Sequence, residues 1–236
     1  MSSFCNSWKI RNPGIEYLFY DDAACRRLVE CDFPQYLACY DGLPYPVQRA
    51  DFFRYLVVYR FGGLYADIDM ECLQPFDCFF SLSGAVLSIE MQISRQRQKE
   101  LGYKFPYQLA NCIFAAEASN PFFLAIIERT VSLAGDNPDC PVSQIEDVTG
   151  PRMLTRAFFD LQPPEVTVLN QIFWMPPREY PKLYPFRKNM FACHHFFGSW
   201  KSPMKRTRKR DWIERGIFPT PFPKTASHTL SSVHVD

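Results

Sequence analysis

The residues of this chain that best suit metal chemistry are two aspartates, Asp67 and Asp69, separated by one residue. In an extended chain, residues two positions apart point to the same side. Two carboxylates that point the same way repel one another unless a cation lies between them, and Mg²⁺ or Mn²⁺ prefers such hard oxygen ligands. Because such an ion has vacant sites for phosphate oxygens, the pair predicts a metal that holds a diphosphate leaving group. An acidic surface turn is the alternative interpretation, since a bare Asp-x-Asp is common.

The elements directly before the two aspartates favour the metal interpretation. Pro46 suits the first turn of a helix, where its missing N–H costs nothing, and a helix is predicted from there to residue 61. Gly62 and Gly63 end this helix, because glycine adopts the left-handed conformation at low cost. Residues 64–66 are predicted to form a short strand that carries the two acids. Five apolar residues recur at helical spacing in the helix and predict one buried stripe: Val47, Ala50, Phe53, Val57 and Phe61.

Composition predicts one α/β domain with a hydrophobic core, since the chain has 236 residues of which 47% are hydrophobic. The net charge of +1 gives no reason to expect nucleic acid as a partner. No run of 18 apolar residues is present, so no transmembrane segment is expected, and the N-terminus lacks the apolar stretch of a signal peptide. The nine cysteines include no C-x-x-C pair, which argues against a zinc module and leaves both free thiols and some disulfides open.

In the rest of the chain, some segments have apolar residues in the pattern of a strand and others have them at helical spacing. The segment 92–104 is polar and charged, and it is predicted to be a loop or an exposed helix. A basic run followed by a Pro/Ser/Thr-rich tail occupies residues 201–236, which we expect to lie outside the folded domain of residues 1–200, with contact to anionic lipid as an alternative. Strands are predicted at 15–20, 85–91, 109–116 and 165–169, and helices at 23–31, 120–133 and 152–160.

A long pattern around the acids resembles the DXD-containing glycosyltransferase sugar-binding family. It consists of R-A-D-x-x-R-Y at 49–55 and Y-R-x-G-G-x-Y-x-D-x-D at 59–69. That family includes fungal initiating α-1,6-mannosyltransferases, inositol-phosphoceramide mannosyltransferases and the glucosylating domains of clostridial toxins. The resemblance implies a GT-A-like nucleotide-sugar-binding domain with a central mixed sheet flanked by helices. Family members begin with an earlier apolar strand, so this chain is expected to lack the family's first strand.

The same resemblance implies a metal site. Asp67 and Asp69 match the metal-binding acids of the family, which use Mn²⁺ or Mg²⁺. The segment F-A-C-H-H-F-F-G-S-W at 191–200 is similar to the family's C-terminal H-h-x-x-G-S-W, whose histidine position matches His194, with His195 as the fallback. An imidazole ligand suits Mn²⁺ better than Mg²⁺.

Residues for the sugar donor are implied in the same way. Asp51 and Arg54 match positions that contact the ribose or the transferred sugar, although a surface ion pair at i, i+3 is the alternative. Tyr65 and Asn111 are implied to lie near the donor sugar, although either could be a core residue. Ser199 and Trp200 could donate hydrogen bonds to the β-phosphate and stabilise the leaving group. The expected donor-binding set is therefore Asp51, Arg54, Tyr65, Asp67, Asn111, Ser199 and Trp200.

The function that these residues predict is metal-dependent transfer of a hexose, with mannose first, to a hydroxyl group of a glycan or glycolipid. The implied donor is GDP-mannose or a UDP-hexose, the implied stereochemistry is retention, and the catalytic residues are Asp67, Asp69 and Arg54. A non-catalytic nucleotide-sugar or glycan-binding protein is the alternative. A metal-dependent phosphatase is disfavoured, because Glu71 stands where that pattern requires Thr or Val. The family implies a Golgi or endomembrane location, although this sequence shows no anchor or signal peptide.

Overall fold

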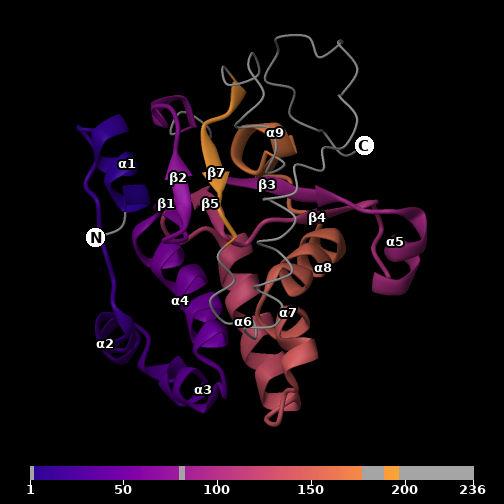
Figure 1. Cartoon of the computed structure of the whole chain (residues 1–236). Coiled ribbons are helices and arrows are strands. Elements are labelled where there is room, and N and C mark those ends of the chain that lie inside the picture. Colours follow the sequence, from indigo (N-terminus) through magenta and orange to yellow (C-terminus); the bar gives the residue numbers. More distant parts are fainter. Residues whose placement is uncertain (1–2, 80–82, 177–188, 197–236) are drawn as a thin grey trace.

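The computed structural model describes residues 3–79, 83–176 and 189–196 (Figure 1). Its centre is a mixed sheet with the strand order β1-β5-β3-β4, and β6 pairs with β3. The β6 strand runs parallel to β3, whereas the other pairs of this sheet are antiparallel. A separate two-stranded sheet joins β2 to β7. The strands are β1 (Gly63–Ala66), β2 (Met70–Cys72), β3 (Ala85–Gln92), β4 (Tyr107–Leu109), β5 (Ile113–Ala116), β6 (Val166–Leu169) and β7 (Ala192–His194).

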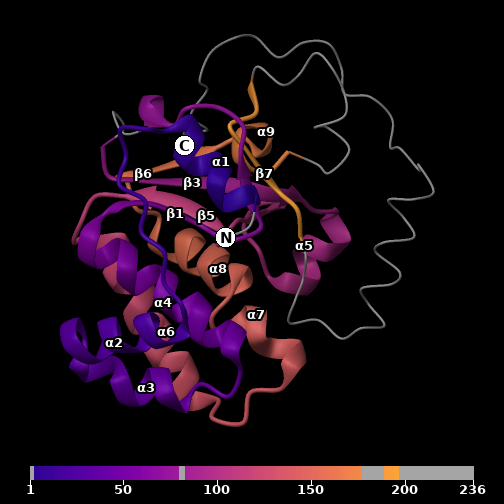
Figure 2. The ribbon, with the colours of Figure 1, turned by 60° about the vertical axis from the view of Figure 1, so that its left-hand side comes forward.

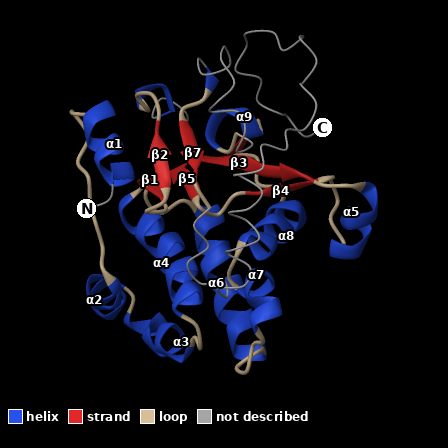
Figure 3. Ribbon diagram, in the orientation of Figure 1, coloured by secondary structure: helices blue, strands red, loops and turns tan. Residues whose placement is uncertain are grey.

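Helices cover both faces of the central sheet, as Figures 2 and 3 show. The helices α4, α6 and α8 lie against one face, and α1 and α9 lie on the other. This arrangement confirms the predicted α/β class with a central mixed sheet flanked by helices. The helices are α1 (Ser3–Arg11), α2 (Asp22–Asp32), α3 (Leu37–Gly42), α4 (Pro46–Phe61), α5 (Arg95–Leu101), α6 (Pro121–Asp136), α7 (Ile145–Val148), α8 (Pro151–Leu161) and α9 (Gln171–Trp174).

The two faces have separate hydrophobic cores because side chains alternate along each strand. In β5, Phe114 and Ala116 belong to the larger core, which also contains buried residues of α4, α6 and α8. Ile113 and Ala115 point to the other face and belong to the smaller core, together with Trp174 of α9. The sheet is therefore buried on both sides, which holds the loops at its edges in fixed positions.

The junction between α4 and β1 depends on glycine, as the sequence predicts. Gly62 has a φ of +69°, and its N–H donates to the carbonyl of Val58 at 2.8 Å. A Cβ atom at Gly62 would lie 2.7 Å from the backbone nitrogen of Ala118. Since the left-handed conformation and the close approach both exclude a side chain, the helix ends here and the chain turns into β1.

The predicted apolar stripe of α4 is buried only in part. Phe53 is buried, but Ala50 is exposed and Phe61 is 49% exposed, whereas Phe52 and Tyr55, outside the stripe, are fully buried. The stripe instead borders a cleft that is described below. Apolar spacing identifies a helix but not its buried side, because this helix packs on more than one neighbour.

Most predicted elements agree with the structure within a few residues. The helices predicted at 120–133 and 152–160 correspond to α6 and α8, and the strands predicted at 85–91 and 165–169 correspond to β3 and β6. The segment 92–104 contains the short helix α5. The predicted boundary at residue 200 and the tail of 201–236 lie outside the described residues.

One predicted strand is wrong, and another is interrupted. Residues 15–20 form no strand in the structure and run as an irregular segment into α2. The segment 109–116 is not one strand, because Ala110 to Cys112 separate β4 from β5. Both segments are apolar enough for a strand, but pairing depends on a partner elsewhere in the chain, which local composition does not specify.

The cysteines and the lengths of the helices bear on two points that composition raised. The nine cysteines all lie among the described residues and form no disulfide, which resolves the open question of their pairing. None of the helices in the described ranges has both the length and the hydropathy needed to span a membrane.

Candidate functional site

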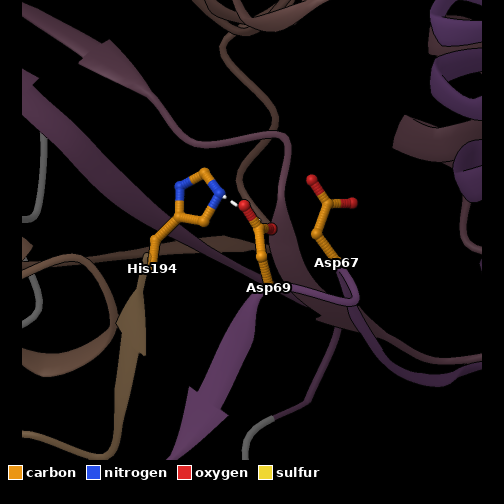
Figure 4. A group of neighbouring side chains, drawn as sticks. All are labelled: Asp67, Asp69 and His194. Carbon is orange, nitrogen blue, oxygen red and sulfur yellow. Dashed lines mark hydrogen bonds and ion pairs between the residues drawn. The ribbon is translucent and has the colours of Figure 1, made fainter. Parts of the chain in front are cut away.

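Asp67, Asp69 and His194 converge beside the end of β1 (Figure 4). One possible ligand atom from each side chain lies within 4.8 Å of those of the other two. The His194 Nε2 atom is 3.1 Å from Asp69 Oδ1. The Nδ1 atom of His194 is buried and has no hydrogen-bond partner among the described residues. Two carboxylates and one imidazole form a donor set that fits Mn²⁺, so the residues present suit the metal that the sequence implies.

The two aspartates meet through a turn and not through an extended strand. Asp67 follows β1 directly, and its carbonyl accepts a hydrogen bond from the Met70 N–H at 2.9 Å. The turn places Asp69 immediately before β2. The expected reason for their convergence, an extended chain with side chains two residues apart, is therefore wrong, although the convergence itself is observed.

The β2–β7 ladder brings His194 to this turn from 125 positions away in the sequence. Met70 is the partner of His194 in the antiparallel register, and the His195 N–H donates to the Asp69 carbonyl at 3.0 Å. The His195 side chain points elsewhere, because its Nε2 atom lies 2.8 Å from a carboxylate oxygen of Glu71. Of the two adjacent histidines, His194 is the one beside the acids.

A buried ion pair lies next to the metal candidates. The side chains of Asp51 and Arg54 are each 6% exposed, and an Arg54 guanidinium nitrogen is 3.0 Å from Asp51 Oδ1. The same guanidinium lies 3.3 Å from Asp67 Oδ1 and donates to the Asn111 carbonyl at 2.7 Å. Arg54 therefore bridges Asp51 and Asp67. The surface ion pair that was the alternative interpretation is excluded by this burial.

Hydrogen bonds fix the carboxylates of this network. The Asn111 side-chain amide donates to Asp51 Oδ1 at 3.0 Å, and the Thr149 hydroxyl donates to Asp51 Oδ2 at 2.9 Å. The Tyr65 hydroxyl donates to Asp67 Oδ1 at 2.7 Å. Thr149 is a site residue that sequence reasoning missed, although the Thr-Gly-Pro tripeptide before α8 was a visible signal.

Burial and charge set the protonation of the pair. Burial raises the pKa of the Asp51 carboxyl to about 6, although the Arg54 guanidinium opposes this shift. Burial acts to lower the pKa of Arg54, but the neighbouring carboxylates of Asp67 and Asp51 outweigh it and hold that pKa well above its ordinary value. The network therefore holds the Arg54 cation between the side chains of Asp51 and Asp67.

These residues line one large cleft with a volume of about 1420 Å³. Its lining includes the three metal candidates and the buried pair, together with apolar side chains such as Ile15, Leu18 and Phe61. Glu90 also lines the cleft and was missed as a site residue. Predicted site residues that share the cleft are Asp51, Arg54, Tyr65, Asp67, Asp69, Asn111 and His194, whereas Ser199 and Trp200 lie outside the described residues.

Comparison with known proteins confirms the resemblance to the DXD-containing glycosyltransferases. Residues 1–92 match the family described as "Glycosyltransferase sugar-binding region containing DXD motif". Inositol phosphoceramide mannosyltransferase 3 of Schizosaccharomyces pombe is 26% identical over 172 residues, which cover 72% of this chain and 44% of that protein. Inositol phosphoceramide mannosyltransferase 2 of the same organism is 39% identical over 118 residues, with 50% and 30% of the two chains covered.

Two further similarities are shorter or more distant. Initiation-specific alpha-1,6-mannosyltransferase of Candida albicans is 34% identical over 84 residues, which cover 34% of this chain and 22% of that protein. The solved structure of PaToxG glycosyltransferase superposes with a TM-score of 0.48 at 17% identity, covering 68% of this chain and 65% of that chain. The chain thus spans less than half the length of these curated relatives.

Proposed function

We propose that this chain is the core of a metal-dependent glycosyltransferase that moves a hexose from a nucleotide sugar to a hydroxyl acceptor. The observation that carries the proposal is the convergence of Asp67, Asp69 and His194 in a large cleft, directly beside the buried pair of Asp51 and Arg54. A metal site alone would suit many reactions. A metal site joined to a polar, hydrogen-bonded pocket suits a ligand that carries both a diphosphate and a sugar.

Asp67, Asp69 and His194 would hold Mn²⁺, with Mg²⁺ as the second choice. When bound, such an ion neutralises the charge that grows on a departing diphosphate. Tyr65 and Arg54 both contact Oδ1 of Asp67, so they orient this carboxylate, which would be one of the ligands of the ion. Because these contacts are set before any ligand binds, little reorganisation is needed during the reaction.

Asp51, Arg54 and Asn111 would bind the sugar part of the donor. Their carboxylate, guanidinium and amide groups can exchange hydrogen bonds with sugar hydroxyls, and their positions are fixed by one another. Ser199 and Trp200 remain predicted donors to the β-phosphate. The three curated relatives named above are mannosyltransferases, which favours GDP-mannose over a UDP-hexose as donor and a glycan or glycolipid as acceptor. Retention of configuration and a Golgi or endomembrane location follow from the resemblance.

Binding and turnover test this proposal separately. The full chain is titrated with Mn²⁺ by calorimetry, and GDP-mannose and UDP-hexoses are then screened for hydrolysis and for transfer by mass spectrometry. We expect Mn²⁺-dependent donor turnover that Asp67→Asn lowers by at least about hundredfold, since electrostatic stabilisation of the leaving group is commonly worth that much. Tight donor binding without turnover would instead support a non-catalytic nucleotide-sugar-binding protein. Turnover that Asp67→Asn leaves intact would refute the proposed site.

A further inference from the structure

Glu90 occupies an irregular position in the central sheet. The register between β3 and β4 pairs Ile89 with Leu109 and Met91 with Gln108, so it shifts by one residue between Ile89 and Met91. Glu90 is the residue at this shift. Such irregularities of an antiparallel pair redirect a side chain and are frequent beside active sites. The Glu90 side chain is half-buried and lines the same cleft as Asp67 and Asn111.

A short chain of hydrogen bonds holds the Glu90 carboxylate. The Tyr103 hydroxyl donates to Gln108 Oε1 at 3.1 Å, and Gln108 Nε2 donates to Glu90 Oε2 at 2.7 Å. Tyr103 and Gln108 are both buried, with 5% and 7% of their surface exposed. Because the tyrosine can satisfy the amide oxygen, the amide nitrogen is directed at Glu90. The carboxylate is therefore oriented by the fold before any ligand enters the cleft.

The position of Glu90 differs from that of the metal candidates. It lies on β3, and it is not one of the three side chains whose ligand atoms cluster in the described part of the chain. A carboxylate repels a diphosphate but accepts a strong hydrogen bond from a hydroxyl group. A hydroxyl is also the group that must be placed beside the donor for transfer to occur.

From this geometry we infer that Glu90 binds the acceptor hydroxyl and orients it toward the anomeric carbon of the donor. The inference rests on the proposed function. In the transfer step the acceptor oxygen forms a bond to the anomeric carbon, and the bond from that carbon to the diphosphate breaks. The electron pair of the broken bond goes to the diphosphate oxygen, which also receives the hydroxyl proton. Glu90 accepts the hydrogen bond of the hydroxyl while the acceptor is being positioned, gives it up as the proton moves to the diphosphate oxygen, and is not itself consumed.

The test compares Glu90→Gln with wild type, and Glu117→Gln serves as the control because Glu117 is exposed outside the cleft. Transfer to a sugar acceptor, donor hydrolysis by water, and the affinities for Mn²⁺ and donor are measured on the full chain. A hydrogen bond to a charged group accounts for about tenfold to hundredfold in rate. We expect Glu90→Gln to lower kcat/KM for the acceptor by that factor. Hydrolysis and the two affinities should stay within about twofold, so that turnover shifts from transfer to hydrolysis.

The outcomes separate this inference from the proposed function. Wild-type transfer that Glu90→Gln leaves intact would overturn the role of Glu90 alone, and so would a loss of donor affinity, which would make Glu90 a donor contact. Absence of metal-dependent turnover in the wild type would overturn the proposed function and this inference with it. If Glu90→Gln lowers the melting temperature, Glu90→Asp is measured as well. It keeps the carboxylate, so a folded Glu90→Asp variant is expected to recover part of the acceptor kcat/KM, and a loss as large as that of Glu90→Gln would refute the inference.

Discussion

Replacing Arg54 with methionine is expected to lower the free energy of unfolding by about 3 to 5 kcal/mol at pH 7, because it removes one partner of a buried ion pair. The Asp51 and Arg54 side chains are each only 6% exposed, so little water reaches the Asp51 carboxylate to compensate for the lost guanidinium. The substitution also removes the hydrogen bond to the Asn111 carbonyl and the contact with Asp67. Most of the cost is expected to arise from the carboxylate of Asp51, which remains buried and loses its cation.

The pH dependence of this cost has a definite sign. The folded-state pKa of Asp51 is raised from 3.8 to about 6, so the fold prefers the protonated carboxyl. The stability that this group contributes is fully present below about pH 4 and is lost as the pH rises through about 6. In Arg54→Met that pKa rises further, because the opposing guanidinium is gone. The loss in free energy of unfolding caused by Arg54→Met should therefore be larger at pH 7 than at pH 5. Between these two pH values, the difference amounts to roughly 1.4 kcal/mol for each unit by which the substitution raises the pKa of Asp51.

Urea unfolding followed by tryptophan fluorescence at pH 5 and pH 7 measures both quantities. Arg60→Met is the matched control, since Arg60 lies on the same helix and its ion pair with Asp32 is largely exposed, which limits its cost to about 1 kcal/mol. The double variant Asp51→Asn/Arg54→Met should be less destabilised than the sum of the single variants by at least about 1 kcal/mol. The reasoning fails if Arg54→Met costs no more than the control, or if its deficit grows on acidification.

Three other outcomes are expected. His194→Ala should weaken Mn²⁺ binding at least about tenfold in a calorimetric titration, whereas His195→Ala should leave it within about twofold, and equal losses would contradict the ligand assignment. Gly62→Ala should lower the free energy of unfolding by about 1 to 2 kcal/mol or more, because the φ of Gly62 is positive and a Cβ there would meet backbone atoms. Gly14→Ala is the control and should change this free energy little, because a Cβ at Gly14 has nothing within 4 Å. Chemical denaturation measures both. A chelator such as EDTA should abolish donor turnover, added Mn²⁺ should restore it, and turnover that persists in EDTA would exclude metal dependence.

The parts of the fold that sequence predicts best are those with local signals at both ends. The helix α4 begins at Pro46 and ends at Phe61, directly before Gly62, and each of these end signals acts within its own turn of the chain. The buried face of that helix was predicted only in part, because burial depends on which neighbours pack against it from elsewhere in the chain. Residues 15–20 have a composition suited to a strand, yet no strand forms there, since a strand also needs an edge with which to pair.

The candidate site divides in the same way. Asp67 and Asp69 are visible in sequence because only one residue separates them. His194 could be assigned only through the family resemblance, since the β2–β7 ladder brings it beside Asp69, which is 125 residues away in the sequence. Glu90 gave a weak local signal, a single charge at the end of an apolar strand, and its orientation depends on a register shift that the sequence does not reveal.

Arg54 makes the sugar-binding and metal-binding halves of the candidate site interdependent. One guanidinium contacts Asp51, which lines the proposed sugar pocket, and Asp67, which belongs to the proposed metal site. A ligand that displaced Asp51 would therefore change the charge balance around Asp67, and a cation bound at Asp67 would weaken the hold of that carboxylate on Arg54. Because the pair is buried, such changes are not screened by water. A metal bound at Asp67 would therefore change sugar binding at Asp51 directly, through the charge of Arg54.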